Sequence, residues 1–368
     1  MRVIVKAIFV FFCIVLTGFF NSAAGFAQDR YIHFSGETGN SIHVTANLIF
    51  TDTKVFGTIL RPSMDEIPVK VYGELQQDRN LVLLEEYSAD TVIRGNISEE
   101  FSFNGFWKDN NANHHPLILN ASKPEKYQQF KVFSQSSVRP LNDSPDSPVA
   151  AFDMVLAMPA SEDNMEVHFR LNKTIGELLK IETSGNISYA IKNQENLFFE
   201  RYQAANASRS TPENYPLLNW QKRVRLFPVF NENGFVSLYM QDYNYTGGDV
   251  SLDISRFLVF DLQKAEKITL SSLIPEEKST ALSEKLRKKL CKNLELSNEI
   301  SLKEQGFFSD EVFPSANFFL TASGIGFHYN TYELAGQERG PLTIFLTWKE
   351  MEGILNTNGP VKRLNTDV

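Results

Sequence analysis

The feature that most limits the fold of this chain is a series of short segments in its first third, in which apolar and polar residues alternate. Several carry a glycine near the middle or end, as in residues 55–59, 69–75, 92–97 and 101–107. A period of two is typical of a strand with one buried face, and glycine inside a strand marks a bulge or a close backbone approach. Residues 28–122 are therefore predicted to form an antiparallel β-meander or a small barrel-like domain.

The remainder is predicted to be a linker followed by a second domain. Residues 123–148 are polar, and their end is rich in the proline, asparagine, aspartate and serine that favour turns. Residues 149–368 mix helical and strand patterns, which favours an α+β fold with an antiparallel sheet. Its clearest helix is expected near 276–294, where leucines recur every four residues. Further helices are expected at 175–179 and 190–205, and strands at 150–158, 223–229, 234–242 and 256–261, with two more within 317–348.

The first 27 residues have the pattern of a secretory signal peptide. Arg2 and Lys6 precede a short apolar run, and small residues follow it, so cleavage is expected after Ala24 or Ala27. An uncleaved signal anchor is the alternative, although the run is shorter than the ~20 residues that a membrane-spanning helix needs. We expect an exported protein, periplasmic or extracellular, that is soluble after cleavage and meets the membrane only during export.

Net charge and cysteine content bear on nucleic-acid binding and on disulfide bonds. The chain has a net charge of −8, and removal of Arg2 and Lys6 with the signal peptide would make it more acidic. A nucleic-acid-binding surface would be basic, so no nucleic-acid partner is expected. Cys291 would be the one cysteine left after cleavage, which rules out an intrachain disulfide. We predict that it is a buried, inert thiol.

The sequence lacks the spacings of common catalytic and metal sites. No pair among the six histidines has the three- or four-residue separation of a helical zinc site. The neighbours His114 and His115 follow several asparagines and are expected in a solvated loop. No Gly-x-Ser-x-Gly nucleophile motif is present. No catalytic residue, metal or cofactor is therefore predicted.

Two stretches of the second domain carry a family resemblance. The first includes LYMQDYNYTGGD at residues 238–249 and FLVFDL at 257–262, and the second includes NFFLTASGIGFHY at 317–329 with Tyr332 and Glu333 after it. In order and spacing they resemble the extracytoplasmic domain shared by RsiV-type anti-sigma factors and PdaC-type peptidoglycan deacetylases, over about residues 150–357. Asp249 stands where that family usually has histidine, and residues 336–339 replace its tyrosine and small residues.

The resemblance implies a role at the bacterial cell envelope. In RsiV-like proteins the domain binds lysozyme, and in PdaC-like proteins it precedes a deacetylase domain. The expected function is a non-enzymatic module that binds a cell-wall hydrolase, such as a lysozyme-like muramidase, or peptidoglycan itself. The alternative is an envelope glycan or peptide hydrolase, or a deacetylase-associated enzyme, using carboxylates such as Glu333 and Asp249. A purely architectural protein is the third interpretation.

The candidate ligand-binding residues lie in two turns of the resembling stretches. Gly247 and Gly248 are interpreted as a tight hairpin turn, because a strand and not a helix follows them. If both turns lie at one end of the sheet, they would form one surface for a polar partner or glycan. Its members would be Tyr245, Gly247, Gly248, Asp249, Tyr332, Glu333 and Arg339. For Glu333 a structural role at the turn is favoured over a catalytic one, and strand tyrosines are more often packed than free to bind sugars.

Overall fold

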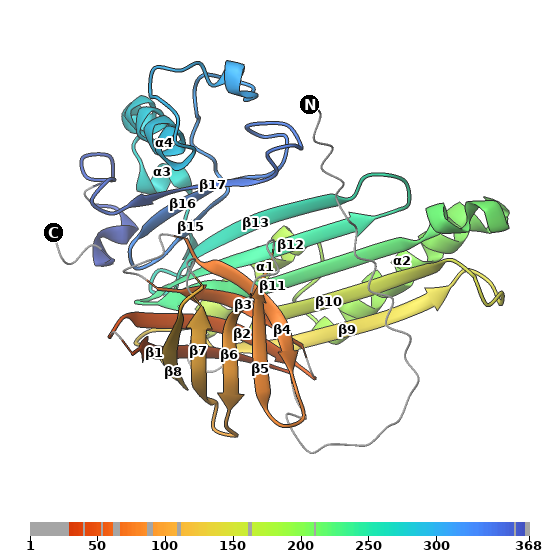
Figure 1. The fold of residues 1–368 in the computed structure, drawn as a ribbon. Helices are drawn as coiled ribbons and strands as arrows, with labels where there is room; N and C mark the ends of the chain where they lie inside the picture. Colours follow the sequence, from red (N-terminus) through yellow and green to blue (C-terminus); the bar gives the residue numbers. More distant parts are fainter. Residues whose placement is uncertain are drawn as a thin grey trace.

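The computed structural model describes residues 29–364, apart from residues 40, 53, 62–66, 87–90, 109–111, 161–163, 210 and 357. The described chain forms a 14-stranded sheet and a separate three-stranded sheet, with helices packed against both (Figure 1). The large sheet runs in the order β14-β13-β12-β11-β10-β9-β1-β2-β3-β4-β5-β6-β7-β8. The predicted α+β class with a largely antiparallel sheet is confirmed.

The first eight strands curl into a barrel-like sheet, as predicted. They are β1 (Arg30–Thr38), β2 (His43–Thr51), β3 (Lys54–Leu60), β4 (Val69–Leu75), β5 (Asn80–Glu85), β6 (Thr91–Ile97), β7 (Ser102–Lys108) and β8 (His114–Ala121). The curl closes because β1 pairs with β2 along one edge and with β8 along the other. Apolar side chains such as Phe34, Leu83 and Phe103 fill the interior, as expected for a barrel of eight strands.

The prediction of a linker over residues 123–148 is wrong for its central part. Residues 130–140 form β9 (Phe130–Pro140), which pairs along its whole length with β10 (Val149–Pro159). The segment looked irregular because β9 buries few large apolar side chains. Its polar side chains are used in contacts instead, as when Ser137 donates to Glu195 at 2.6 Å. Only residues 141–148 form the turn between the two strands, with the Leu141 amide donating to the Pro148 carbonyl at 2.9 Å.

The middle of the chain extends the same sheet and adds two helices. Strands β11 (Trp220–Glu232), β12 (Phe235–Tyr245), β13 (Leu252–Asp261) and the short β14 (Glu266–Lys267) continue it. Between β10 and β11 lie α1 (Met165–Leu179), α2 (Ile187–Asn206), η1 (Ala207–Arg209) and η2 (Pro212–Leu218). This crossover makes β10 and β11 parallel, a pairing that the sequence did not predict. Asn164 and Asn186 cap the two helices with their side chains, and both helices cover the far side of the sheet in Figure 1.

The C-terminal part is a module built around the small sheet. It contains α3 (Leu270–Leu273), η3 (Glu276–Lys278), α4 (Ser279–Asn293), η4 (Lys303–Gln305) and η5 (Pro360–Arg363), with strands β15 (Phe318–Leu320), β16 (Gly324–Tyr329) and β17 (Leu342–Thr347). The predicted helix at 276–294 is confirmed, with Leu282, Leu286 and Leu290 buried. Cys291 is buried too, as predicted. Residues 317–348 hold three strands where two were expected.

A row of aromatic rings joins the barrel, the large sheet and the C-terminal module. Phe227 in β11 meets Phe56 of the barrel at 5.6 Å between ring centroids and Tyr239 in β12 at 5.2 Å. From Tyr239 the row continues to Phe257 at 5.2 Å and then to Phe319 of the small sheet at 4.8 Å. Since aromatic rings bury large apolar areas, this row holds the three parts together.

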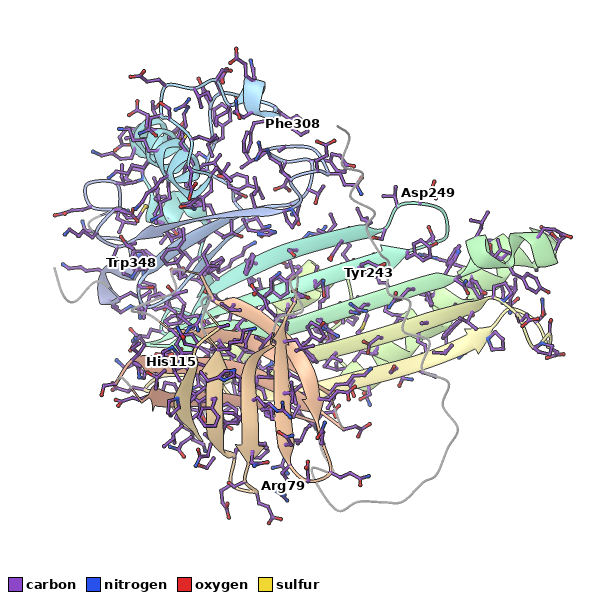
Figure 2. All side chains as sticks on the ribbon, viewed as in Figure 1. Arg79, His115, Tyr243, Asp249, Phe308 and Trp348 are labelled. Atoms are coloured by element: carbon purple, nitrogen blue, oxygen red, sulfur yellow. The ribbon has the colours of Figure 1, made fainter. Side chains whose placement is uncertain are left out.

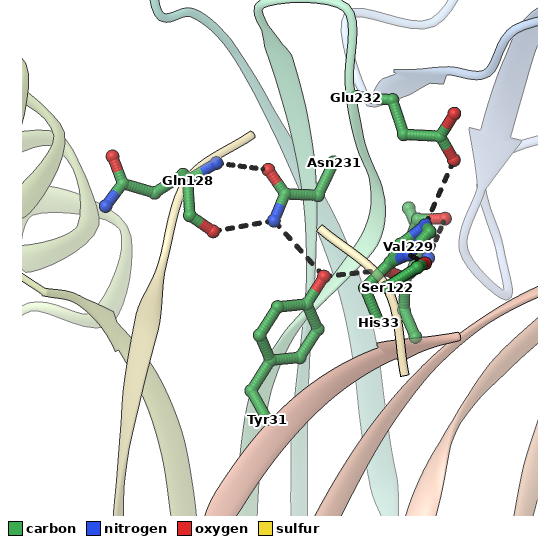
Figure 3. A network of polar contacts seen from close by, with 8 residues as sticks. Tyr31, His33, Ser122, Gln128, Val229, Asn231 and Glu232 are labelled. Atoms are coloured by element: carbon green, nitrogen blue, oxygen red, sulfur yellow. Dashed lines mark hydrogen bonds and ion pairs between the residues drawn. The ribbon is translucent and has the colours of Figure 1, made fainter. Parts of the chain in front are cut away.

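A network of hydrogen bonds also connects the barrel to β11 (Figure 3). Asn231 accepts a hydrogen bond from the Gln128 amide at 2.8 Å and donates to the Gln128 carbonyl at 2.7 Å and to the Tyr31 hydroxyl at 3.2 Å. The Tyr31 hydroxyl in turn donates to Asn47 at 2.7 Å. Burial raises the pKa of Tyr31, so its hydroxyl keeps its proton. With its members satisfied by one another, the network is structural.

Within residues 29–364 as described, none of the helices has both the length and the apolar character needed to cross a lipid bilayer. The predicted signal peptide, residues 1–27, lies outside the described residues. Apart from the linker, the proposed division of the chain into domains stays a prediction, and the continuous sheet runs across its boundaries.

A candidate binding site on the open face of the large sheet

Three consecutive strands place polar side chains on the side of the large sheet that faces away from α1 and α2. Cross-strand partners share a face, and the register aligns Arg225 with Gln241 and Gln241 with Ser255. One step further out, Arg223 aligns with Tyr243 and Tyr243 with Asp253. Residues at the alternate positions of these strands, such as Val224, Leu226 and Met240, join the core beneath the helices. We call this surface the polar face and define it as Arg223, Arg225, Gln241, Tyr243, Asp253 and Ser255; Figure 2 labels Tyr243 on it.

The inner end of the polar face is anchored to the barrel by Lys70 of β4. Its ammonium group donates to the Tyr239 hydroxyl at 3.1 Å and lies 3.2 Å from the Glu86 carboxylate. The Tyr239 hydroxyl also lies 3.0 Å from the Ser255 hydroxyl. Because these groups satisfy one another, this end of the face is a polar contact between barrel and sheet.

Further out, three polar atoms of the polar face have no hydrogen-bond partner among the described residues. They are Nε of Arg225, Oε1 of Gln241 and Oδ1 of Asp253, all shielded from water. Gln241 is only 3% exposed and uses its Nε2 to donate to Oδ2 of Asp253 at 3.0 Å. An unsatisfied buried polar group costs roughly 1–3 kcal/mol, so these three atoms lower the stability of this part of the sheet.

The pKa values of two charged groups on this face are shifted from their ordinary values. Burial raises the pKa of Asp253, and the nearby Glu86 raises it further, while the hydrogen bond from Gln241 opposes both. Burial also lowers the pKa of Arg225, and the neighbouring Arg223 adds to that effect. Both shifts disfavour the charged forms, so the face gains from a partner that supplies complementary hydrogen bonds.

A small cavity of about 100 Å³ lies where the barrel, the large sheet and the small sheet meet. Its lining includes Thr58 and Lys70 from the barrel and His328 and Thr343 from the small sheet. Nδ1 of His328 and the Thr343 hydroxyl share a hydrogen bond of 3.0 Å. Nε2 of His328 has no partner among the described residues. Burial, assisted by Lys70, lowers the pKa of His328 to about 4.

The buried His328 should make stability depend on pH. Its folded pKa of about 4 lies below the ordinary value of 6.5, so the unfolded chain binds the proton more tightly. The contribution to stability is therefore complete above pH 6.5 and is lost as the pH falls from 6.5 towards 4. Between pH 6.5 and pH 4, we expect the free energy of unfolding to fall further in the wild type than in the His328→Gln variant. The difference between the two falls should be on the order of 3 kcal/mol. Urea denaturation at several pH values measures this, and parallel profiles for variant and wild type would contradict it.

The structure confirms that the double glycine is a hairpin turn, between β12 and β13. Gly247 and Gly248 have φ angles of +87° and +86°, the left-handed region that favours glycine. A Cβ atom at Gly247 would lie 2.1 Å from the Leu217 carbonyl oxygen, so no side chain fits there. Tyr245 donates its hydroxyl to the Gly248 carbonyl at 2.9 Å, and Asp249 lies exposed at the tip (Figure 2).

The second predicted turn lies between β16 and β17 and is held by internal contacts. Glu333 accepts from the backbone and side-chain nitrogens of Asn330, at 2.9 and 3.3 Å, so the structural role favoured for it is confirmed. Arg339 donates to the Gln305 carbonyl and stacks over Phe307, while Tyr332 is 60% exposed and donates to Gln337. No hydrogen bond or ion pair between described residues joins this turn to the β12–β13 turn.

Two other features of the described chain have some of the properties of a site. His114 and His115 do not lie in a loop as expected but begin β8, where His115 stacks on Trp107 at 4.7 Å. A hollow of about 640 Å³ lies beside α1 and residues 180–184. Its Thr183 hydroxyl is already used, donating to the Asn172 carbonyl at 2.8 Å. Neither feature gathers unpartnered buried polar atoms, so the polar face is the better candidate.

Sequence reasoning missed most of the polar face, although a signal was present. In β11, Arg223 and Arg225 flank Val224, and in β12, Gln241 and Tyr243 flank Asp242. Such alternation predicts a strand with one polar side, but it does not tell an ordinary solvated side from a binding surface. What marks the site is the pairing of three such strands, which only the fold provides.

Comparison with known proteins supports the fold more than the function. Residues 271–349 match the family described as "Protein of unknown function (DUF3298)". The crystal structure of a DUF3298 family member from Bacteroides fragilis is similar, with 18% identity over 66% of this chain and 99% of that one and a TM-score of 0.58. A DUF3298 family protein from Pseudomonas aeruginosa PAO1 has 14% identity over 62% and 95%, with a TM-score of 0.43. No curated protein matches the chain.

Proposed function

We propose that this chain is an exported envelope protein that binds peptidoglycan through the polar face and catalyses no reaction. The amino-terminal pattern of Arg2, Lys6 and the following apolar run supports export. The RsiV- and PdaC-like stretches, the second of which lies within the DUF3298 match, support a role at the cell wall. The polar face supplies the binding surface, and Tyr245 extends it towards the hairpin turn.

The observation that carries the proposal is the register that gathers the half-buried side chains of Arg223, Tyr243 and Asp253 on one face of β11, β12 and β13. They form a surface of mixed charge, where an arginine and a carboxylate lie on either side of the Tyr243 ring. A surface of this kind suits a polar, hydroxyl-rich polymer better than a lipid or a nucleic acid. Peptidoglycan offers hydroxyl, amide and carboxylate groups together, which matches both signs of charge.

The catalytic alternative has less support. A glycosidase needs two carboxylates about 5–9 Å apart across one cleft. Both Glu333 oxygens are hydrogen-bonded to Asn330, and Asp249 is exposed at the tip of another hairpin. Asp253 has a raised pKa, yet its Oδ2 is held by Gln241. We therefore favour binding without chemistry.

Co-sedimentation with purified sacculi tests the proposal. The mature chain, from residue 28, should pellet with sacculi, and Tyr243→Ala should reduce the bound fraction about tenfold, because a packed aromatic contact at a binding site contributes ~1–2 kcal/mol. Tyr189→Ala is the matched control, since this tyrosine is 74% exposed on α2, on the other side of the sheet.

The same assay with immobilised muramidases separates the two envelope ligands. Binding to sacculi but not to a muramidase fits the proposal. If the chain binds a muramidase but not sacculi, the ligand is a hydrolase and not the glycan, which would contradict the proposal. Equal losses of sacculus binding in the Tyr243 and Tyr189 variants would contradict it too.

A further inference from the structure

We propose that a hollow on the C-terminal module receives a basic side chain, lysine or arginine, of a partner protein. The hollow has a volume of about 220 Å³ and lies between residues 308–315 and the turn that follows β16. We call it the aromatic hollow and define it by Phe308, Glu311, Phe313, Glu333 and Leu334. No residue of the polar face lines it, so this inference goes beyond the proposed function and does not depend on it.

Two phenylalanine rings of the aromatic hollow are exposed to solvent. Phe308 is 56% exposed and Phe313 is 60% exposed, and Figure 2 labels Phe308 on this module. Their neighbours Phe307 and Val312 are buried and belong to the core of the module. The core therefore takes one apolar side chain from each neighbouring pair and leaves the other outside. Two large rings on one hollow are a surface that gains free energy when a partner covers it.

The segment that carries the two rings is held in place by hydrogen bonds, although it forms neither helix nor strand. The Phe308 amide donates to the Leu334 carbonyl at 2.9 Å, and the Tyr329 hydroxyl donates to the Phe313 carbonyl at 2.7 Å. Between them, the Asp310 carbonyl accepts from Nε of Arg287 at 3.0 Å. The hollow is therefore preformed, which reduces the free energy that ordering it would cost on binding.

The charges of the aromatic hollow favour a cation. Glu311 and Glu333 both line it, and none of the described residues that line it is lysine, arginine or histidine. Glu333 accepts its hydrogen bonds from Asn330, which carries no charge to offset that of the carboxylate. The faces of the two phenylalanine rings add negative partial charge, which attracts a cation within about 6 Å.

Lysine and arginine side chains have the shape that this combination requires. Their aliphatic stems pack on apolar surface while the charged head stays near water and carboxylates. The same module already contains one such contact, because the Arg339 guanidinium lies 4.6 Å from the centre of the Phe307 ring. A neutral apolar side chain would cover the rings but would leave both carboxylates without a partner.

The surface beside the hollow indicates a protein and not a small free amine. Tyr332 precedes Glu333 in the chain and is 60% exposed, so exposed aromatic surface continues past the hollow. Aromatic side chains are enriched where proteins bind one another. A small amine would fill the hollow and leave Tyr332 uncovered, whereas a protein would cover both. The net charge of −8 would also steer a basic partner towards this chain.

NMR titration of the mature chain with blocked tripeptides tests the inference. Gly-Lys-Gly presents the cation, and Gly-norleucine-Gly has the same apolar stem without the charge. We expect the lysine peptide to bind about fivefold more tightly, and an arginine peptide to bind about as well as the lysine peptide. The preference for lysine over norleucine should shrink between about 50 and 500 mM sodium chloride, because salt screens exposed charges.

Two variants report on the two kinds of contact. Phe313→Leu keeps an apolar side chain and removes the ring, and Glu311→Gln removes one negative charge. Each should weaken binding of the lysine peptide about threefold. The matched controls are Phe106→Leu and Glu100→Gln, at exposed positions of the barrel, and neither should change it. All four changes are at exposed side chains, so thermal unfolding should stay close to that of the wild type.

The outcomes separate this inference from the proposed function. Equal affinity for the lysine and norleucine peptides, or lysine binding that Phe313→Leu and Glu311→Gln leave intact, would overturn it. Phe313→Leu should sediment with sacculi as well as the wild type does. If it loses sacculi and the lysine peptide together, the hollow binds amines of the cell wall, and the protein partner is wrong. A chain that binds the lysine peptide but not sacculi keeps this inference and contradicts only the proposed function.

Discussion

Replacing Phe227 by alanine is expected to lower the free energy of unfolding by about 3–5 kcal/mol. Phe227 is 4% exposed and lies in the middle of the aromatic row, against Phe56 of the barrel and Tyr239 of the large sheet. Removing its ring leaves a cavity where the barrel meets the sheet, which the rigid strands on either side cannot close. Urea denaturation followed by tryptophan fluorescence measures the loss.

Phe169→Ala is the matched control for this experiment. Phe169 is 65% exposed on α1, so the same change should cost no more than about 0.5 kcal/mol. A Phe227 variant as stable as the Phe169 variant would mean that the aromatic row does not hold the barrel to the sheet. Two separate unfolding transitions in the Phe227 variant would instead show that the row couples the parts into one cooperative unit.

A second large loss of stability is expected for Asp261→Ala, of about 3 kcal/mol. The Asp261 carboxylate is fully buried and accepts hydrogen bonds from the backbone amides of Gln263 and Lys264, at 2.9 and 3.2 Å. It also pairs with Arg363 at 2.5 Å, which ties the end of β13 to η5 near the C-terminus of the described chain. Alanine removes all of these acceptors at once.

Asp261→Asn should cost roughly half as much, because the amide oxygen keeps one or two of the hydrogen bonds while the ion pair is lost. Asp249→Ala is the matched control at an exposed aspartate and should leave stability within about 0.5 kcal/mol of wild type. Thermal unfolding of the three variants side by side gives the ranking. An Asp261→Ala variant as stable as the control would show that the buried carboxylate is not what holds the turn after β13.

The parts of the fold that follow from local pattern were predictable. The strands of the barrel alternate in polarity, and Leu282, Leu286 and Leu290 repeat at the period of α4, so both were read from the sequence. Gly247 and Gly248 marked the hairpin for the same reason, since local backbone geometry required them.

The parts that depend on pairing between distant segments were not predictable. β9 carries few large apolar residues, so its sequence resembles a linker. It forms a strand because its partner β10 and helix α2 stabilise it through contacts. The parallel pairing of β10 and β11 requires a crossover through two helices, which no single segment reveals. The polar face depends on pairing in another way. Arg223, Tyr243 and Asp253 lie on three successive strands, and only the register of β11, β12 and β13 places them side by side on one face.

A crystal structure of the mature chain soaked with soluble muropeptide fragments tests the central claim most directly. We expect sugar density on the polar face, with contacts to the half-buried side chains of Arg223, Tyr243 and Asp253. Ordered ligand at the turns that hold Asp249 and Tyr332, with the polar face left to solvent, would contradict it.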